Sequence, residues 1–433
     1  MALSIRFLLI RSIILALLVG SQLYLFLRGD RAVRQSRLSP RRKRQLRLAL
    51  AGYFVSILTI YFSFLSRTAL LQHPSPLILY GLIYPAAIWG FGSLFSFLFL
   101  ALTDLIGWCA RLPRSRAVDA REPPAAVPDP SRRQFVQTAL WTISAAPVLI
   151  SGYGASYESA GLRIEEVRLR VSRDRPALTL RRPSGLSAGP SILRQDSGQA
   201  RLRAGFDPPL KVVQVSDIHS GLFMSPARMR RYAEAVQQLQ PDLFVLTGDF
   251  ISNSLAYLAP CVKEMARVRT RYGSFAVLGN HEHWYGEPDE IVPIFDAEGI
   301  PVLQNAHRVV ETDRGPLGLA GIDDLRFGRP DLEQALEGLD AALPTILLSH
   351  RPEIFPRAAA RNVALTLSGH YHGGQVKLSL LGFELSLARM LSPYTEGLYR
   401  LGGSHLYVNR GLGTTGTPVR LNAPPEITLF HLT

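Results

Sequence analysis

The chain has little cysteine and, in its N-terminal third, little negative charge. Its 433 residues include only two cysteines, Cys109 and Cys261, which lie in different regions and exclude a disulfide framework or a thiolate metal site. Residues 1–133 contain 18 Lys and Arg but only 5 Asp and Glu, so almost all of the net charge of +14 lies there. A nucleic-acid-binding domain would carry its basic patch on the folded module itself. We therefore expect no nucleic-acid partner.

The N-terminal third reads as membrane-spanning sequence. Each of its long apolar stretches is close to the roughly 20 residues that a helix needs to cross the hydrocarbon core, and they cover 7–27, 48–66, 76–103 and 135–154. The first could instead be a signal peptide, because Arg6 and Arg11 accompany its apolar run, but the three later stretches favour an anchor. We expect a membrane region with three transmembrane helices over 1–108 and a fourth transmembrane helix over 134–156.

Arginine-rich loops predict the orientation. Basic residues dominate 28–47 and the linker 109–133, and positive loops remain in the cytoplasm. Four spans then place the N-terminus and everything after Gly154 outside the cytoplasm, in a multi-pass protein of the cell membrane. Ser131-Arg132-Arg133-Gln134-Phe135 is similar to a twin-arginine export signal. The two arginines could equally be ordinary positive-inside anchors, and both interpretations place the following domain outside.

Residues 157–210 are expected to connect the membrane region to a second domain. The alternating segment GLRIEEVRLRVS predicts a strand. From 172 to 209 the sequence is rich in Arg, Gly, Pro and Ser, which predicts an exposed loop. Contact of its arginines with anionic headgroups is the alternative; these are Arg181, Arg182, Arg201 and Arg203.

From Lys211 onward, apolar runs alternate with helical segments, which predicts an α/β domain over 211–433. Five runs end directly at polar residues, in KVVQVSDIH, LFVLTGD, FAVLGNHEH, TILLSH and VALTLSGHYH. Such runs are typical of strands buried on both faces, and α/β sheets build their sites at the carboxyl ends of these strands. The candidate metal ligands are Asp217, His219, Asp249, Asn280, His350, His370 and His372. Any one of them could be a turn, cap or core residue, but seven at strand ends indicate a site.

The chemistry of these side chains points to metal ions. Carboxylate, amide and imidazole ligands suit Mn, Zn or Fe. Seven ligands are too many for one tetrahedral ion and fit two divalent ions, which serve phosphoryl transfer by orienting the nucleophile and neutralising phosphate oxygens. Nearby polar residues are expected to be structural instead; these are His283, His307, Asp323 and Arg410.

The motifs DIH, GD, GNHE, SH and GHYHGGQ occur in the order of the calcineurin-like metallophosphoesterases, and 211–433 resembles the membrane-associated branch of that superfamily. The resemblance implies an α/β two-sheet sandwich flanked by helices, here preceded by an all-α transmembrane region. It also implies that one ion is bound by Asp217, His219 and His372, the other by Asn280, His350 and His370, with Asp249 bridging and His281 as the catalytic histidine. Tyr371 departs from the pattern, since a smaller residue is expected between the two histidines.

The sequence therefore predicts a membrane-anchored, metal-dependent phosphoesterase that hydrolyses a phosphomonoester, phosphodiester or pyrophosphate bond, with a lipid-linked substrate as one option. An alternative is a UDP-2,3-diacylglucosamine-type pyrophosphatase of lipid A synthesis, although that reaction faces the cytoplasm. An alternative of another class is a non-catalytic metal-binding membrane sensor or transporter component; the spans are nearly free of the charges that mark a transport path. A metallohydrolase acting on amides is a further option that spacing alone does not exclude.

Overall fold

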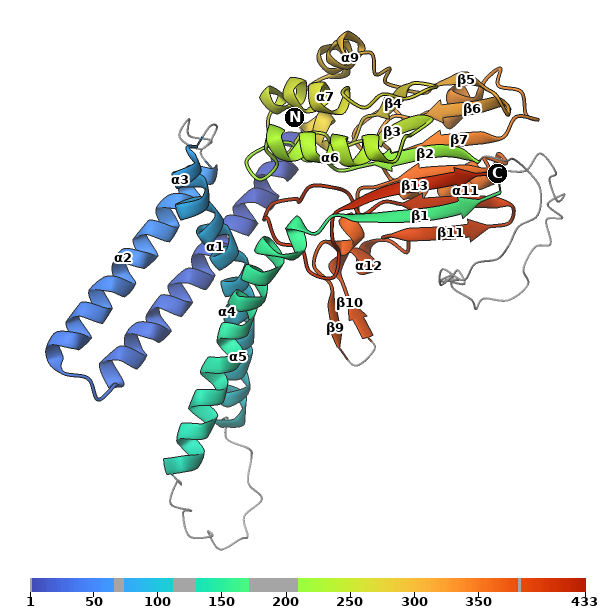
Figure 1. Cartoon of the computed structure of the whole chain (residues 1–433). Coiled ribbons are helices and arrows are strands. Elements are labelled where there is room, and N and C mark those ends of the chain that lie inside the picture. The colour runs from blue at the N-terminus through green and yellow to red at the C-terminus, as the bar shows by residue number, and fades with distance from the viewer. Residues whose placement is uncertain (1, 66–73, 112–129, 171–208, 381–382) are drawn as a thin grey trace, which may run out of the picture. The chain divides into compact units, whose positions relative to one another are not determined.

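The computed structural model describes residues 2–65, 74–111, 130–170, 209–380 and 383–433. The chain divides into two compact units, Met1–Ser156 and Tyr157–Thr433 (Figure 1). Most of the expected basic linker 109–133 and of the expected exposed loop 172–209 lies outside the described residues, including the four arginines of that loop.

The first unit consists of helices. Its elements are α1 (Ala2–Gln35), α2 (Pro40–Leu65), α3 (Pro76–Ile78), a π-helical turn η2 (Leu79–Ile83), α4 (Tyr84–Arg111) and α5 (Pro130–Ser156). Long helices therefore stand at all four expected positions. By length and composition, two helical stretches of the described residues could cross a membrane, Pro40–Phe62 and Pro76–Cys109. The first and fourth expected spans are helical but are not among these two.

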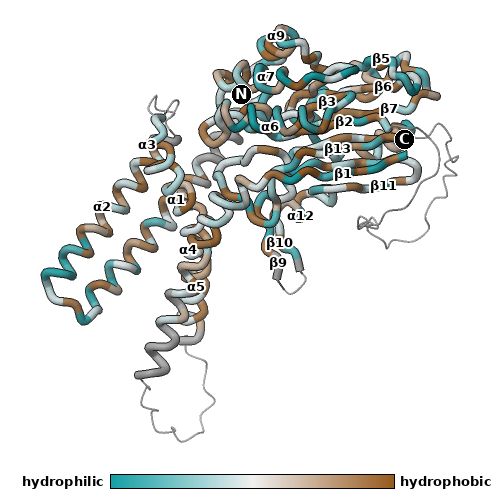
Figure 2. Tube along the Cα trace, in the orientation of Figure 1, coloured by the Kyte–Doolittle hydropathy of each residue, from teal (hydrophilic) through white to brown (hydrophobic). Residues whose placement is uncertain are grey.

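Polar and small residues join the helices of this unit. Gln22 of α1 donates to Ser93 Oγ of α4 and accepts from Trp89 Nε1, both at 2.8 Å. Gly92 lies directly against the backbone of Val148 in α5, so no larger residue fits there. Close approach at small residues is a common way to pack apolar helices. Figure 2 shows hydrophilic residues gathered at the turn between α1 and α2, where the sequence reads SRLSPRRKR.

The second unit contains two large sheets. The first has the order β1-β13-β2-β3-β4, and the second has the order β11-β12-β8-β7-β6-β5. The strands of the first are β1 (Arg163–Leu169), β13 (Glu426–Leu432), β2 (Leu210–Val215), β3 (Leu243–Thr247) and β4 (Ser274–Val277). Those of the second are β11 (Gly397–Leu401), β12 (Ser404–Val408), β8 (Leu365–Ser368), β7 (Thr345–Leu348), β6 (Gly315–Gly321) and β5 (Ala306–Thr312).

Parallel pairing in the centre of each sheet aligns the strand ends that matter. β2, β3 and β4 are parallel to one another, as are β12, β8, β7 and β6, whereas β13 runs antiparallel to β2. One apolar core fills the space between the sheets, with Val212, Val245, Leu348 and Leu367 all fully buried. The carboxyl ends of both sets of parallel strands therefore meet along one edge of the sandwich.

Helices cover the outer faces. α6 (Pro226–Gln238), α7 (Leu258–Met265), α8 (Asn280–Tyr285) and α9 (Pro288–Ala297) belong to the side of the first sheet, and α10 (Leu332–Leu336) and α11 (Phe355–Ala360) to that of the second. α6 begins as its sequence predicts, with Ser225 accepting from the Arg228 amide and Pro226 following. The expected α/β two-sheet sandwich flanked by helices is confirmed.

The second unit begins earlier in the chain than the expected boundary at 211. β1 pairs in parallel with β13 over seven residues, from Arg163↔Glu426 to Leu169↔Leu432. The alternation of GLRIEEVRLRVS correctly predicts a strand, but the sequence gives no sign that its partner is the last strand of the chain. Residues 163–169 are thus part of the sandwich and not of a connecting segment.

Candidate metal centre

The seven candidate ligands lie in loops at the carboxyl ends of strands from both sheets. Asp217 and His219 follow β2, Asp249 follows β3 and Asn280 follows β4, while His350 follows β7, and His370 and His372 follow β8. Five of these residues have positive φ: Asp217, His219, Asp249, His370 and His372. Left-handed backbone at non-glycine residues costs roughly 1 kcal/mol or more and persists only where the surroundings impose it. These turns are strained in order to direct polar side chains inward.

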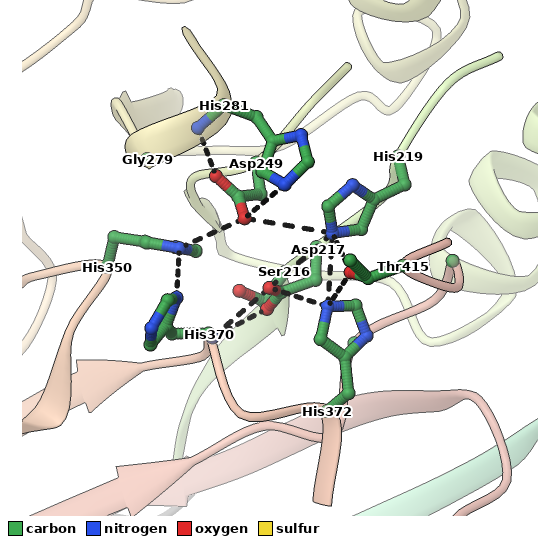
Figure 3. A network of polar contacts seen from close by, with 12 residues as sticks. Ser216, Asp217, His219, Asp249, Gly279, His281, His350, His370, His372 and Thr415 are labelled. Carbon is green, nitrogen blue, oxygen red and sulfur yellow. Dashed lines mark hydrogen bonds and ion pairs between the residues drawn. The ribbon is translucent and has the colours of Figure 1, made fainter. Parts of the chain in front are cut away.

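One group of ligands gathers around His219 and His372. Their Nε2 atoms are 3.0 Å apart, and His372 Nε2 lies 3.3 Å from Asp217 Oδ1. Thr415 Oγ1 completes the cluster at 3.2 Å and 3.0 Å from the two nitrogens. The Asp217, His219 and His372 donor atoms all lie within 4.8 Å of one another, close enough to hold a metal ion. Figure 3 shows these side chains converging on one side of Asp249.

A second group lies on the other side of Asp249. Asp249 Oδ2 is 3.2 Å from His350 Nε2 and 3.7 Å from His219 Nε2, so this one carboxylate faces both groups. His370 Nδ1 lies 3.2 Å from His350 Nε2. Asp249, His350 and His370 again place donor atoms within 4.8 Å of one another. The carboxylate of Asp249 is therefore positioned to be shared by two ions (Figure 3).

Asn280 lies beside the second group but contacts an arginine. It is the first residue of α8, is buried, and its Oδ1 accepts from Arg351 Nη2 at 2.9 Å. Arg351 Nη1 lies 2.6 Å from His370 Nε2, and Arg351 Nε donates to Asp324 Oδ2 at 2.8 Å. Since a carbonyl oxygen has two lone pairs, the arginine leaves one on Asn280 available. Arg351 was not among the site residues expected from the sequence. The one sequence feature that could have indicated it is its position directly after His350.

Backbone carbonyls fix the ring orientation of two histidines. His350 Nδ1 lies 2.8 Å from Thr247 O, and His281 Nδ1 lies 2.7 Å from Ser252 O. A carbonyl can only accept, so each Nδ1 carries a proton and each Nε2 is directed at the site, where His281 Nε2 is 4.0 Å from Asp249 Oδ2. Such outer contacts are how proteins orient metal-binding imidazoles.

Glu282 ties the loops together from behind. Its buried carboxylate accepts from the backbone N–H groups of Asp249 (2.9 Å), Phe250 (2.8 Å), Ile251 (3.2 Å) and Gly279 (2.8 Å). It therefore holds the turn after β3 against the turn after β4. A Cβ on Gly279 would collide with Asp249, so only glycine allows this approach. The sequence motif GNHE contains Glu282, but its part in joining two loops is visible only in the structure.

Burial and charge set the protonation of the cluster. Burial lowers the pKa of His219 and His372 to about 3, so both rings are neutral and offer lone pairs. Burial also acts to lower the pKa of His350, but the adjacent Asp249 carboxylate raises it to about 10. In turn, burial acts to raise the pKa of Asp249, but the imidazoles of His350 and His281 hold it well below the usual range. The neutral imidazoles of His219 and His372 and the ionised Asp249 form a donor set for cations, whereas His350 has to give up its extra proton before it can bind a metal ion.

These residues fit a pair of divalent ions. The donors are carboxylate oxygens and imidazole nitrogens, which suit Mn, Zn or Fe. His219 Nδ1 is buried without a hydrogen-bond partner among the described residues. All polar contacts of this ring in the centre are therefore made by its Nε2 atom. The crowding of two neutral Nε2 atoms at 3.0 Å is favourable only with a cation or proton between them.

The residues expected to be structural have structural contacts. His283 Nε2 lies 2.6 Å from Asp323 Oδ1, and His307 Nδ1 lies 3.1 Å from Ala335 O. Arg410 pairs with Glu165 of β1 at 2.5 Å and with Glu426 of β13 at 2.6 Å, which fastens β1 to the sandwich. Tyr371, the departure from the family pattern, packs edge-on against His370 and donates to Glu353. It braces a ligand without replacing one.

Comparison with known proteins agrees with this geometry. Residues 210–374 match the family model described as calcineurin-like phosphoesterase. The chain is 35% identical over 231 residues to the uncharacterized metallophosphoesterase YkuE of Bacillus subtilis, covering 53% of this chain and 80% of that protein. It is 33% identical over 233 residues to the transmembrane protein with metallophosphoesterase domain of Danio rerio, covering 51% and 52%.

The chain thus spans about half the length of that zebrafish relative. Among solved structures, a dimetal phosphatase from Danio rerio matches with 12% identity and a TM-score of 0.32, over 48% of this chain and 88% of that one. The match to YkuE, at 35% identity over most of its length, establishes the relationship. The chain belongs to the calcineurin-like metallophosphoesterases, a family of phosphate-ester hydrolases that use a dinuclear metal centre.

Proposed function

We propose that this protein is a membrane-anchored phosphoesterase that uses two divalent metal ions to hydrolyse a phosphomonoester, phosphodiester or pyrophosphate bond. The observation that carries the proposal is the position of Asp249. Its carboxylate lies between two groups of imidazoles, 3.7 Å from His219 Nε2 and 3.2 Å from His350 Nε2. A shared carboxylate between two nitrogen-rich groups suits a dinuclear centre of the kind that serves phosphoryl transfer.

In this proposal the ligands divide as the geometry groups them. Asp217, His219 and His372 hold one ion, and His350 and His370 hold the other together with Asn280. Asp249 serves both. The ions, when bound, supply Lewis-acid stabilisation of the phosphate oxygens and of the attacking oxygen.

His281 is proposed to serve the leaving group. The contact of its Nδ1 with Ser252 O fixes the ring so that Nε2 faces the centre. A proton on Nε2 can then pass to the departing oxygen, which is general acid catalysis. Arg351 adds a fixed positive charge at the edge of the second group, where its guanidinium orients Asn280 Oδ1.

The first unit is proposed to hold the enzyme in the cell membrane, with the catalytic unit on the extracytoplasmic side. Two stretches of suitable length and apolarity support the anchor. The arginine-rich turn between α1 and α2 supports the extracytoplasmic orientation when α5 also crosses the membrane. The name of the zebrafish relative, transmembrane protein with metallophosphoesterase domain, agrees with the anchor. In the same proposal, Arg132 and Arg133 act either as a twin-arginine export signal or as positive-inside anchors.

The test uses the full chain in detergent, stripped of metal and assayed on p-nitrophenyl phosphate and bis-p-nitrophenyl phosphate with added Mn²⁺ or Zn²⁺. We expect metal-dependent turnover that Asp249→Ala lowers by more than about 100-fold, beyond the loss typical of an outer-sphere change. Asp296→Ala, at an exposed site on α9, is the matched control and should retain full activity. Binding of two metals without turnover of either ester or of a phospholipid would support a metal-holding sensor instead.

A further inference from the structure

An apolar surface lies close to the metal centre and has no part in it. β9 (Leu378–Leu380) and β10 (Phe383–Leu385) form a two-stranded sheet of their own, and the short helix α12 (Leu387–Leu391) follows. Figure 1 shows this hairpin projecting away from the two large sheets. Five large aliphatic side chains of these elements are exposed, and we call them the apolar hairpin surface: Leu378, Leu385, Leu387, Met390 and Leu391.

Local geometry gathers these side chains in two sets, one on the hairpin and one on the helix that follows it. Leu378 and Leu385 are direct partners in the β9–β10 pair, so both point to the same face of the hairpin. Leu387, Met390 and Leu391 are spaced i, i+3 and i+4, which is one face of a helix. Their exposed fractions are 76%, 75% and 78%. By contrast, Ala388 on the same helix is buried, so α12 turns its small residue inward and its large ones toward solvent.

Several contacts join the surface to the loops of the metal centre. Lys377, directly before β9, is buried and pairs with Glu396 at 2.6 Å, and Asn422 donates to its carbonyl at 2.8 Å. α12 contacts the turn η6 (His372–Gly374), which contains a candidate metal ligand. A Cβ on Gly374 would collide with Ser386, at the start of α12. The hairpin and helix are therefore directly connected to the site.

We propose that the apolar hairpin surface inserts into the boundary layer of a lipid bilayer, beside the active site. Soluble proteins rarely expose so many neighbouring large aliphatic residues without a partner. Hot spots of protein interfaces are enriched in Trp, Tyr and Arg and poor in leucine, whereas four of the five exposed members here are leucines. The flanking charges, Arg389 and Glu384, neutralise each other at 2.8 Å, which lowers the cost of approaching lipid.

The bilayer in this proposal is the one that the chain's own helices are suited to cross. Two of its helical stretches are long and apolar enough to span one, so the surface is tethered to a membrane by covalent connection. Amphipathic elements in this situation lie about 5–10 Å into the headgroup and acyl boundary. A phosphate ester in the headgroup layer would then lie at the level of the metal centre. This last step rests on the proposed catalytic function, whereas the insertion rests only on the proposed membrane anchor.

The test places a fluorophore on the surface in the full chain. In a Cys109→Ser background, Leu387→Cys is labelled with an environment-sensitive NBD dye, and the protein is reconstituted into phosphatidylcholine vesicles with or without doxyl-labelled lipid. Val309→Cys, on β5 and exposed at 45%, is the control position. We expect blue-shifted emission and at least twofold quenching at 387, and neither at 309. In a Leu385→Ser/Leu391→Ser background the quenching at 387 should fall to the level of 309.

Equal quenching at both positions would overturn the insertion. A blue shift at 387 without lipid quenching, growing with the protein-to-lipid ratio, would assign the surface to a second copy of the chain and also overturn it. The catalytic step is tested separately with phosphatidic acid in vesicles and with soluble p-nitrophenyl phosphate. Leu385→Ser/Leu391→Ser should lower hydrolysis of the lipid at least threefold and leave the soluble ester unchanged. An equal effect on both substrates, or an effect on neither, would overturn the idea that insertion brings a lipid phosphate to the metal centre. Absence of all turnover would refute the proposed function and leave the quenching result unaffected.

Discussion

Glu282→Gln should strongly destabilise the catalytic unit, although it only replaces one carboxylate oxygen with an NH₂ group. The Glu282 carboxylate accepts four backbone hydrogen bonds, two at each oxygen. A glutamine keeps one oxygen and turns an NH₂ group toward the other pair of N–H donors. Two buried N–H groups then lose their acceptor, each at about 1–3 kcal/mol, for a total of roughly 2–6 kcal/mol. That is a large share of the 5–15 kcal/mol typical of a folded domain.

The assay is urea unfolding of the compact unit Tyr157–Thr433, followed by the fluorescence of Trp284, the sole tryptophan of that unit. Glu298→Gln makes the same chemical change at an exposed position at the end of α9 and should leave the midpoint unchanged. Because Glu282 positions the turns that carry Asp249 and Asn280, Zn²⁺ affinity by calorimetry should fall about 10–100-fold as well. A variant with wild-type stability and wild-type metal affinity would refute the reasoning.

Two further predictions concern ion pairs around the centre. Arg351→Met leaves the fully buried Asp324 carboxylate without its cation, and should lower the free energy of unfolding in urea by about 3–5 kcal/mol. If the double variant Arg351→Met/Asp324→Asn recovers none of this stability, the ion pair is not the cause of the loss. Burial lowers the pKa of His283, but the hydrogen bond to Asp323 raises it above 6.5 overall, while the pKa of Asp323 falls to about 2. The pair therefore stabilises the fold between about pH 4 and 6.5, and its contribution is lost as pH rises through the raised pKa of His283 or falls toward 2. His283→Gln should be more destabilising at pH 6 than at pH 9, and an equal effect at both values would contradict the assignment.

The sequence predicted the sheet centres and their ligands because both depend on local patterns. β2, β3, β4, β7 and β8 are short apolar runs buried on both faces, and each ends at a polar residue that faces the site. Parallel strands bring such ends to one edge whatever the order of the strands. This rule predicted that the seven ligands lie at one edge, whereas the place of Asp249 between the two groups was implied by the resemblance to the metallophosphoesterases.

What the sequence did not predict depends on partners far along the chain. β5 has a mixed exposure pattern and pairs only at the sheet edge, so its run lacks the continuous apolar signal. α7 ends at Met265, because the chain must turn before β4. Arg351 could have been a surface arginine; only the approach of Asp324 and Asn280 from two other loops makes it a buried cation.

The strain at the centre and the anchoring of its loops have one physical explanation. Asp217, His219, Asp249, His370 and His372 adopt left-handed backbone that none would prefer alone. Backbone N–H groups freed by these turns are satisfied by carboxylates, as His370 N–H is by Asp217 at 2.9 Å and Asp249 N–H is by Glu282. The same carboxylates thus compensate for the strain and supply negative charge where cations are to be held. A centre built this way should become more rigid, and more stable, when metal binds, because the ions neutralise the charges that the fold has concentrated there.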